Sequence, residues 1–287
     1  MTNNNNANAE VYSPAHYPRS LGFIRVRNAR HLGGYPTKDG KKVKDHLLLR
    51  TGRMNDATPE DIARAVEEFN IKTIVDFRTA IERERAPDPE IAGVENKHLN
   101  VFGDEFRDGL MVGFIYNRST KSPLEQIMEL ENPFEDLNRE HRRVYRSFVT
   151  SDSPLKAYRE FFQTALNLDE GSMSWHCSAG KDRAGIGAAL MLMALGVNWK
   201  TIKEDYLMSN YYFQDRIDSF VDFSKTLTDR EEIWEVARVM SGVDGSWFDA
   251  THDELLRQYG SEEGFLKEGL QLSNSDLALL RNKYLKN

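Results

Sequence analysis

The 287-residue sequence predicts an α/β domain built around a parallel β-sheet. Two pairs of adjacent predicted elements, each made of one helix and one strand, support this prediction. Residues 58–69 show a helical pattern that leads directly into an apolar, β-branched run at 71–77, which is typical of a buried strand. A second short strand is predicted at 173–176, and an apolar helix follows it at 183–195. Helices and strands that alternate in this way favour a sheet whose strands run parallel.

The beginning of the chain is predicted to hold a flexible tail followed by two short strands. Residues 1–20 are assigned to the tail, because the Asn-rich start has neither the basic nor the apolar stretch of a secretory signal. Strands are expected at 23–26 and 47–49, and glycine-containing turns at 33–34 and 39–40 separate them.

The first helix has a clear start signal. Threonine is a favourable N-cap residue, so Thr58 is predicted to cap this helix, and Pro59 suits its first position. Three apolar residues at helical spacing, Ile62, Val66 and Phe69, are expected to face the core.

The remainder of the chain is predicted to be mainly helical. Residues 104–146 and 215–260 are predicted to be helical insertions that can form a lid. Residues 21–287 are otherwise predicted to form one domain, since no internal repeat and no flexible linker is visible. Further helix starts are predicted at four capping residues: Ser153, Asn198, Ser261 and Ser273.

Composition restricts the classes of function and partner. The formal net charge of -7 argues against a nucleic-acid-binding protein, which needs an excess of cations. One cysteine supplies neither a disulfide framework nor a thiolate metal site, so we expect a reducing, cytoplasmic location; export by an unmarked route stays open. The longest apolar run, 184–197, is too short to cross a bilayer, so no integral membrane segment is expected. The oligomeric state is not predicted.

One segment combines residues suited to phosphate chemistry. Five residues separate Cys177 from Arg183, at the junction of a predicted strand and the apolar helix. The first amides of a helix have no intrahelical partner, and the helix dipole adds positive charge there, so this junction favours an anion. A glycine inside the loop allows its backbone N–H groups to surround one phosphate. The loop residues expected to bind phosphate are Ser178, Ala179, Gly180 and Lys181.

The two ends of this loop suit phosphoryl transfer. A thiol at a helix N-terminus near cations is expected to ionise, so Cys177 is the candidate nucleophile. Arginine donates paired hydrogen bonds to phosphate oxygens, so Arg183 is the candidate phosphate clamp. Attack on phosphorus would form a phosphocysteine that water then hydrolyses. The sequence therefore predicts a cysteine-dependent phosphomonoesterase. Lys181 is either a further substrate contact or a solvated surface lysine.

A leaving alkoxide or phenoxide is helped by a proton donor, and four aspartates are candidates. Asp182 is the first candidate because it lies inside the loop. Asp76 is the second, because it ends the predicted buried strand and strand ends line the ligand crevice in such sheets. Asp104 and Asp108, on the first predicted insertion, come last.

Residues 176–183 resemble the signature of protein tyrosine phosphatases, His-Cys-x-x-Gly-x-x-Arg. With lysine and aspartate inside the loop, the segment is similar to the atypical microbial tyrosine and phosphoinositide phosphatases. The resemblance extends over about residues 21–287, because segments 28–34, 49–53 and 75–79 are each similar to a motif of that family.

This resemblance implies a parallel sheet of four to five strands flanked by helices. It implies hydrolysis of phosphotyrosine, sometimes with phosphoserine, phosphothreonine or phosphoinositides, without a metal or another cofactor. It favours Asp182 as the general acid, and it places Arg50 and Arg78 at motif positions that support phosphate binding. Lys181 resembles the pattern of lipid-directed members, so the expected partners are phosphorylated proteins or phosphoinositides.

Two residues depart from the family pattern. His31 replaces the usual aspartate, and Ala184 replaces a hydroxyl residue expected to help the thiolate leave the phosphoenzyme. Three alternatives to a tyrosine phosphatase stay open. One is an inositol-phosphate or phosphoinositide phosphatase with the same chemistry, and a second, motivated by Ala184, is a catalytically weak module that binds phosphorylated ligands. The third is a redox sensor built on the single thiol, which would need an external thiol to resolve its oxidised form.

Overall fold

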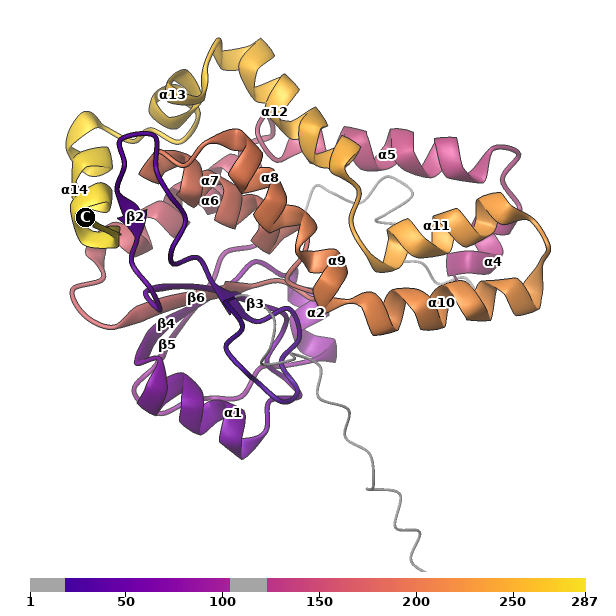
Figure 1. The fold of residues 1–287 in the computed structure, drawn as a ribbon, viewed down its shortest axis with the longest axis horizontal. Helices are drawn as coiled ribbons and strands as arrows, with labels where there is room; N and C mark the ends of the chain where they lie inside the picture. The colour runs from indigo at the N-terminus through magenta and orange to yellow at the C-terminus, as the bar shows by residue number, and fades with distance from the viewer. Residues whose placement is uncertain (1–18, 104–122) are drawn as a thin grey trace, which may run out of the picture.

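A five-stranded sheet forms the centre of the protein, as seen in a computed structural model that describes residues 19–103 and 123–287 (Figure 1). The strands, in their order across the sheet, are β1 (Arg30–His31), β3 (Leu48–Thr51), β6 (Ser172–His176), β4 (Ile71–Asp76) and β5 (Glu95–His98). β3, β6, β4 and β5 run parallel, and β1 pairs antiparallel at one edge. The prediction of an α/β fold with a mainly parallel sheet is confirmed.

Helices cover both faces of this sheet (Figure 1). α6 (Asp152–Asn167) and α7 (Arg183–Leu195) cover one face, whereas α1 (Pro59–Ala63) and the π-helix η1 (Arg64–Glu68) cover the other. Consecutive residues of one strand enter the two cores, since Val75 packs with α7 and Ile74 packs with η1. Burial on both faces explains why every residue of β6, and every residue of β4 except Lys72, is buried.

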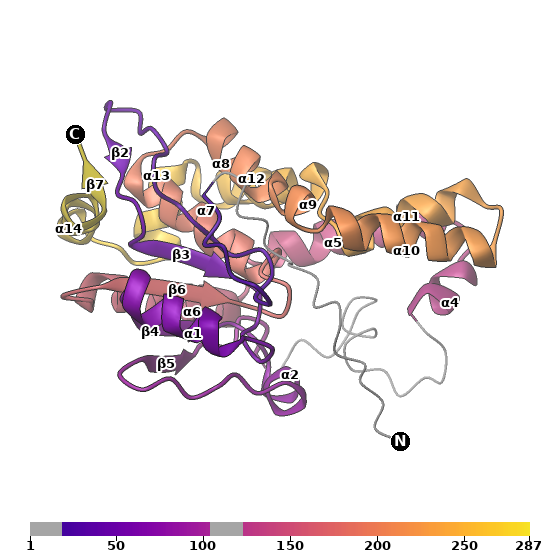
Figure 2. The same cartoon turned by 60° about the horizontal axis from the view of Figure 1, so that its bottom comes forward.

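A group of helices extends away from the sheet. Figures 1 and 2 show α10 and α11 side by side, with α4 and α5 beside them. Their bounds are α4 (Pro123–Met128), α5 (Pro133–Ser147), α10 (Gln214–Leu227) and α11 (Glu231–Ser241). The described parts of the two predicted insertions are therefore helical, whereas residues 104–122, with Asp104 and Asp108, lie outside the described residues, as does the predicted tail up to residue 18.

The remaining elements surround this framework. They are β2 (Lys42–Val43), α2 (Ala80–Arg85), α8 (Trp199–Leu207), α9 (Ser209–Tyr212), α12 (Gly245–Tyr259), α13 (Glu262–Gly264), η2 (Phe265–Gly269), α14 (Asn274–Tyr284) and β7 (Leu285–Lys286). β2 and β7 pair with each other, so the last residues pack beside an early segment of the chain. Among the described residues, no helix combines the length and apolar character that crossing a membrane requires.

The capping predictions are largely confirmed. The side chains of Asn198, Ser261 and Ser273 each accept a hydrogen bond from the backbone three residues further on. Thr58 forms a full capping box with Asp61. The helix predicted to begin at Ser153 is α6, which begins one residue earlier.

The predicted strand at 23–26 is wrong. Phe23 and Val26 fill the smaller core, but the intervening N–H groups of Ile24 and Arg25 donate to the carboxylate of Asp61, at 2.5 and 3.0 Å. A side chain, not a neighbouring strand, therefore accepts these backbone hydrogen bonds.

The predicted apolar face of the first helix is also partly wrong. Val66 is 36% exposed, while its neighbour Ala65 is fully buried. The helix changes to π geometry at Arg64, and the wider turn shifts the residues that face the core. Phe69, at the end of this helix, is buried as predicted.

We expect Asp61→Ala to lower the free energy of unfolding by about 3 kcal/mol, because the partly buried N–H groups of Ile24, Arg25 and Thr58 lose a charged acceptor. Chemical denaturation measures this change. Glu60→Ala removes an exposed acid from the same turn and is the matched control, with an expected change below about 0.5 kcal/mol. Equal losses in the two variants would contradict the assigned role of Asp61.

Candidate active site

The loop from Cys177 to Asp182 joins the carboxyl end of β6 to the first residue of α7. Cys177 is 2% exposed and Arg183 is 5% exposed, so both ends of the loop are almost completely withdrawn from solvent. Gly180 has a φ of 70°, which only glycine adopts easily. The predicted strand, loop and helix around the cysteine are therefore present.

The carbonyl oxygens of this loop are bonded to groups behind it. Arg50 and Asn28 both donate to the Gly180 carbonyl, at 2.7 and 2.9 Å, and the Arg53 N–H donates to the Ser178 carbonyl at 3.2 Å. Within residues 19–103 and 123–287, the N–H groups of the loop donate to no protein group. They remain available to bind an anion together with the N-terminus of α7.

A buried carboxylate holds the arginine behind the loop. Asp205 of α8 accepts from Arg50 at 2.7 Å, from Arg30 at 3.1 Å and from the Tyr35 hydroxyl at 2.9 Å. Burial alone would raise the pKa of Asp205, but the charges of Arg30 and Arg50 outweigh it and lower that pKa to about 2. Arg50 is predicted to support phosphate binding, and its guanidinium bonds Asp205 and the loop backbone, so we expect that support to act through the shape of the loop.

Glu82 of α2 orients the arginine at the end of the loop. Its carboxylate accepts two hydrogen bonds from Arg183, at 2.6 and 2.7 Å, and a third from the Ser178 hydroxyl at 2.5 Å. Although burial opposes ionisation, these contacts lower the pKa of Glu82 and raise that of Arg183. Sequence reasoning missed Glu82. A detectable signal was its place in a capping box with Thr79, directly after β4.

Asp182 is held by a hydroxyl group and does not cap its helix. The Tyr145 hydroxyl donates to Asp182 Oδ1 at 2.5 Å and lies 2.8 Å from the Tyr206 hydroxyl. The Asp182 side chain makes no capping hydrogen bond to α7. Its carboxyl group thus lies at the N-terminus of α7 but accepts no hydrogen bond from the backbone N–H groups there. Tyr145 comes from α5, inside the first predicted insertion.

Asp76, the second candidate acid, belongs to an ion-pair cluster. Both of its carboxylate oxygens accept from Arg78 at 2.9 Å, and Arg78 also pairs with Asp88. Burial opposes ionisation, but His176 and Arg78 lower the pKa of Asp76. A carboxylate committed in this way is a poor proton donor. The prediction of Asp76 as an acid is therefore corrected to support of the strand end. Arg78, predicted to support phosphate binding, is held in the same ion-pair cluster.

The same cluster has ligand atoms at metal-binding spacing. Side-chain atoms of Asp76, Asp88 and His176 lie within 4.8 Å of one another. The guanidinium of Arg78 bonds both carboxylates, so a cation already occupies the centre of their charge. We assign this cluster to internal ion pairing.

Lys181 points away from the loop. Its amine donates to the carbonyl oxygens of Met240 and Gly242, both at 2.6 Å, at the end of α11. Burial lowers the pKa of this amine. The structure thus shows neither of the two predicted alternatives, a substrate contact or a solvated lysine. The Lys181 amine links the loop to the end of α11 by hydrogen bonds.

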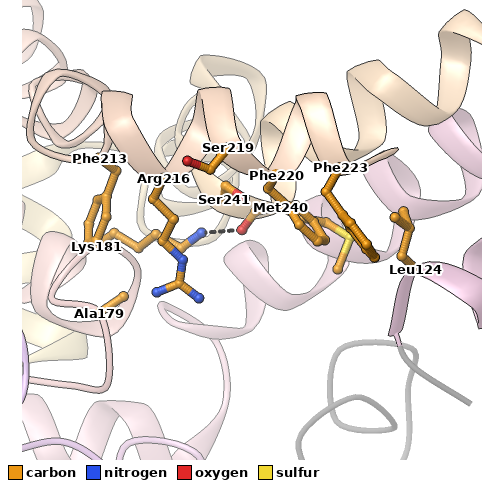
Figure 3. Close-up of a pocket in the computed structure, with 10 residues that line it drawn as sticks. All are labelled: Leu124, Ala179, Lys181, Phe213, Arg216, Ser219, Phe220, Phe223, Met240 and Ser241. Carbon is orange, nitrogen blue, oxygen red and sulfur yellow. Dashed lines mark hydrogen bonds between the residues drawn. The ribbon is translucent and has the colours of Figure 1, made fainter. Parts of the chain in front are cut away.

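An apolar cavity of about 540 Å³ lies beside the loop (Figure 3). Three phenylalanines of the α10 region and Met240 form much of its wall, and Ala179 brings the loop to its edge. Its lining residues are Leu124, Ala179, Lys181, Phe213, Arg216, Ser219, Phe220, Phe223, Met240 and Ser241. The cavity can hold an apolar or aromatic group next to a phosphate in the loop.

The two departures from the family pattern lie in packed surroundings. Burial lowers the pKa of His31 to about 4, so the ring is neutral at pH 7 and its Nδ1 accepts from the Gly33 N–H at 3.0 Å. Ala184 is fully buried in α7, and its carbonyl oxygen accepts from the Trp175 indole at 3.0 Å.

Gly180→Ala is expected to abolish tight binding of an anion such as vanadate. An added Cβ would lie 2.2 Å from the Thr51 carbonyl oxygen, so the loop must shift away from Arg50 and Asn28. Calorimetric titration with vanadate measures the change. Gly93→Ala is the control, since this glycine also has a positive φ but a Cβ there meets nothing within 4 Å. Unchanged vanadate affinity in Gly180→Ala would disprove the assigned loop geometry.

His176 is expected to make stability depend on pH. Burial opposes its charged form, but Asp88 and Asp76 raise the pKa of His176 above its ordinary value of 6.5. The charged ring then stabilises the fold fully below about pH 6.5, and this contribution is lost as pH rises through the higher folded pKa. We therefore expect the Tm difference between wild type and His176→Gln to shrink from pH 6 to pH 9. A difference that is constant across this range would contradict the prediction.

Comparison with known proteins agrees with this geometry. A sequence model of the tyrosine phosphatase family matches residues 21–286. A Cupriavidus necator protein with a provisional tyrosine-protein phosphatase name is 29% identical over 92% of this chain and 88% of its own length. A tyrosine-protein phosphatase of Nostoc commune is 27% identical over 75% and 66%, and the triple specificity phosphatase PtpB of Mycobacterium tuberculosis is 32% identical over 43% and 47%. With its strand, loop and helix around Cys177, the chain belongs to the tyrosine phosphatase family and is a hydrolase of the phosphatase type.

Proposed function

We propose that this protein hydrolyses phosphotyrosine through a phosphocysteine intermediate formed on Cys177. One observation supports the proposal above all. Arg50 and Asn28 donate hydrogen bonds to the Gly180 carbonyl of the loop, while the loop N–H groups donate to no group among the described residues. Such a set of fixed donors stabilises the charge of a phosphoryl group in the transition state. The reaction requires no metal and no other cofactor.

The reaction proceeds in two balanced steps. The Cys177 thiolate forms a bond to phosphorus as the bond to the leaving oxygen breaks, and Asp182 gives that oxygen its proton. Water then attacks the phosphocysteine, Asp182 takes up a proton, and the sulfur leaves as a thiolate with release of inorganic phosphate. The Tyr145 hydroxyl, at 2.5 Å, keeps the Asp182 carboxyl group in position.

Arg183 retains a pair of donors for the substrate. Glu82 accepts one N–H from each terminal nitrogen, and the Phe77 carbonyl takes a second from Nη1 at 3.5 Å. A guanidinium has five N–H groups, so contacts within the described part of the chain leave the Nε–H and one Nη2–H along one edge. This edge matches two phosphate oxygens, as in other bidentate arginine contacts.

The substrate is proposed from the surroundings of the loop. The apolar cavity bordered by Ala179 favours the aromatic ring of phosphotyrosine in a protein substrate. The triple specificity name of one relative supports testing phosphoserine, phosphothreonine and phosphoinositides as well. A nucleophilic thiol has to stay reduced, so we propose the cytoplasm as its place of action. A module that only binds phosphorylated ligands is distinguished by its failure to release phosphate.

We expect Cys177→Ser to reduce phosphate release by about a thousandfold or more, because a hydroxyl is a far weaker nucleophile than a thiolate. Asp182→Asn is expected to lower kcat by about a hundredfold with phosphotyrosine peptide. With an aryl phosphate whose phenol is strongly acidic, the loss in Asp182→Asn is expected to be much smaller, since that leaving group needs no proton. Steady-state release of inorganic phosphate measures all three effects.

The control for these variants is Asp253→Asn, which removes a carboxylate from the outer surface of α12. Wild-type turnover in Cys177→Ser would rule out the covalent route. An equal loss in Asp182→Asn with both leaving groups would remove Asp182 from the role of proton donor. Binding of phosphotyrosine peptide without any phosphate release by the wild type would favour the binding module instead.

A further inference from the structure

A second cavity, of about 330 Å³, borders the same loop and is strongly cationic. Ser178 and Ala179 belong both to its wall and to the loop. Among the residues that the structure describes, four arginines line it, against one carboxylate, that of Asp56. These arginines are Arg25, Arg27, Arg53 and Arg216. The mechanism proposed above uses none of their side chains.

Close packing of the backbone brings these arginines to the loop. The Gly52 N–H donates to the Arg27 carbonyl at 2.7 Å, and an added Cβ on Gly52 would lie 3.1 Å from that carbonyl and 3.5 Å from the one of Ala179. The next residue, Arg53, bonds the Ser178 carbonyl through its backbone. Two arginine-bearing segments are thus held directly against the loop by glycine packing and backbone hydrogen bonds.

The fourth arginine comes from the opposite side. Arg216 belongs to α10, and Figure 3 shows its guanidinium reaching from that helix toward Ala179. Loss of solvent, followed by the nearby charges of Arg27 and Arg53, lowers the pKa of Arg216. Arg27 pairs with Asp215 at 3.3 Å, but that carboxylate is 54% exposed and offsets the charge only weakly. Arg27 and Arg53 therefore repel the guanidinium of Arg216, and an anion bound between them would relieve this repulsion.

We propose that this cavity is a second anion subsite, which binds a second phosphate group carried by the same substrate molecule. The inference rests on the proposed function of the loop, which holds the first phosphate. Arginine pairs best with the oxygens of a phosphate, and four of them suit a dianion better than a single carboxylate.

The geometry also limits the size of the substrate. The subsite begins at Ser178, the residue after the nucleophile, so the two phosphates must lie close together on one compact scaffold. A six-membered ring polyol with phosphates on neighbouring carbons meets this requirement, either free in solution or as a lipid headgroup. Two phosphotyrosines of one peptide are separated by long flexible side chains and fit less well.

The test compares inositol 4,5-bisphosphate with inositol 4-phosphate in the full-length protein. In the double variant Arg53→Gln, Arg216→Gln, we expect the ratio of kcat/KM for the bisphosphate over the monophosphate to fall about tenfold or more. Lys225→Gln is the matched control, since it removes a positive charge from α10 outside the cavity. The control is expected to keep the wild-type ratio.

A lipid substrate shows whether the ring polyol phosphate is bound free in solution or as a lipid headgroup. Phosphatidylcholine vesicles with phosphatidylinositol 4,5-bisphosphate present the same ring phosphates as the soluble compound, and the faster wild-type turnover identifies the source. The inference requires the ratio for the soluble pair to fall in the double variant. An effect seen only on vesicles would overturn it, because the arginines would then act on the membrane surface.

Two further results would overturn the inference. One is an unchanged ratio in the double variant while the wild type hydrolyses both soluble compounds. The other is an equal loss of kcat/KM in the double variant with a peptide whose phosphotyrosine is flanked by glutamates. The site would then recognise carboxylates.

If the wild type shows no turnover, the subsite is tested by calorimetric titration of Cys177→Ser protein with the bisphosphate and the monophosphate. The bisphosphate is expected to lose about tenfold in affinity relative to the monophosphate when the two arginines are replaced. Failure of wild-type turnover together with this loss would refute the proposed reaction but support the subsite. Equal affinities with and without the arginines would refute the subsite itself.

Discussion

The shape of the phosphate loop depends on hydrogen bonds made to its outer side. Arg50 and Asn28 converge on the carbonyl of Gly180, and Asp205 holds Arg50 by a buried ion pair at 2.7 Å. Removing one partner of such a pair would leave a buried charge without compensation, so the arrangement resists local change. With its carbonyls occupied, the loop keeps its N–H groups for a ligand. The nucleophile, the arginine clamp and the proposed proton donor all take their positions from this frame.

Charge is arranged so that an acidic chain presents a cationic site. The chain carries a net charge of -7, yet its buried acids near the loop are paired with buried arginines. Glu82 restrains Arg183 and leaves one edge of its guanidinium for phosphate, while Asp205 neutralises Arg50 behind the loop. The helix dipole and the arginines of the second cavity then determine the local field. Net charge therefore says little about which ligand this site attracts.

Helix starts and buried strands were predictable because their signals are local. Thr58 and Ser273 cap helices with neighbouring residues, and the run at 71–76 is rich in β-branched residues that suit a strand with helices on both faces. The segment 23–26 also contains buried apolar residues and was therefore predicted to be a strand. The N–H groups of Ile24 and Arg25, however, donate to the carboxylate of Asp61, more than 30 positions further along the chain. Apolar residues indicate burial, and they do not reveal which group accepts the backbone hydrogen bonds.

By itself, the sequence determined the reactive segment: a cysteine and an arginine with five residues between them, a glycine among those five, and a helix that begins at the arginine. Their chemistry is encoded locally, in residue type and spacing. Only the tertiary structure decided the partners of these groups. Glu82 meets Arg183 across 101 positions, and Lys181 meets Met240 across 59. Such contacts depend on how the sheet and the helices pack, and no short-range pattern contains that information.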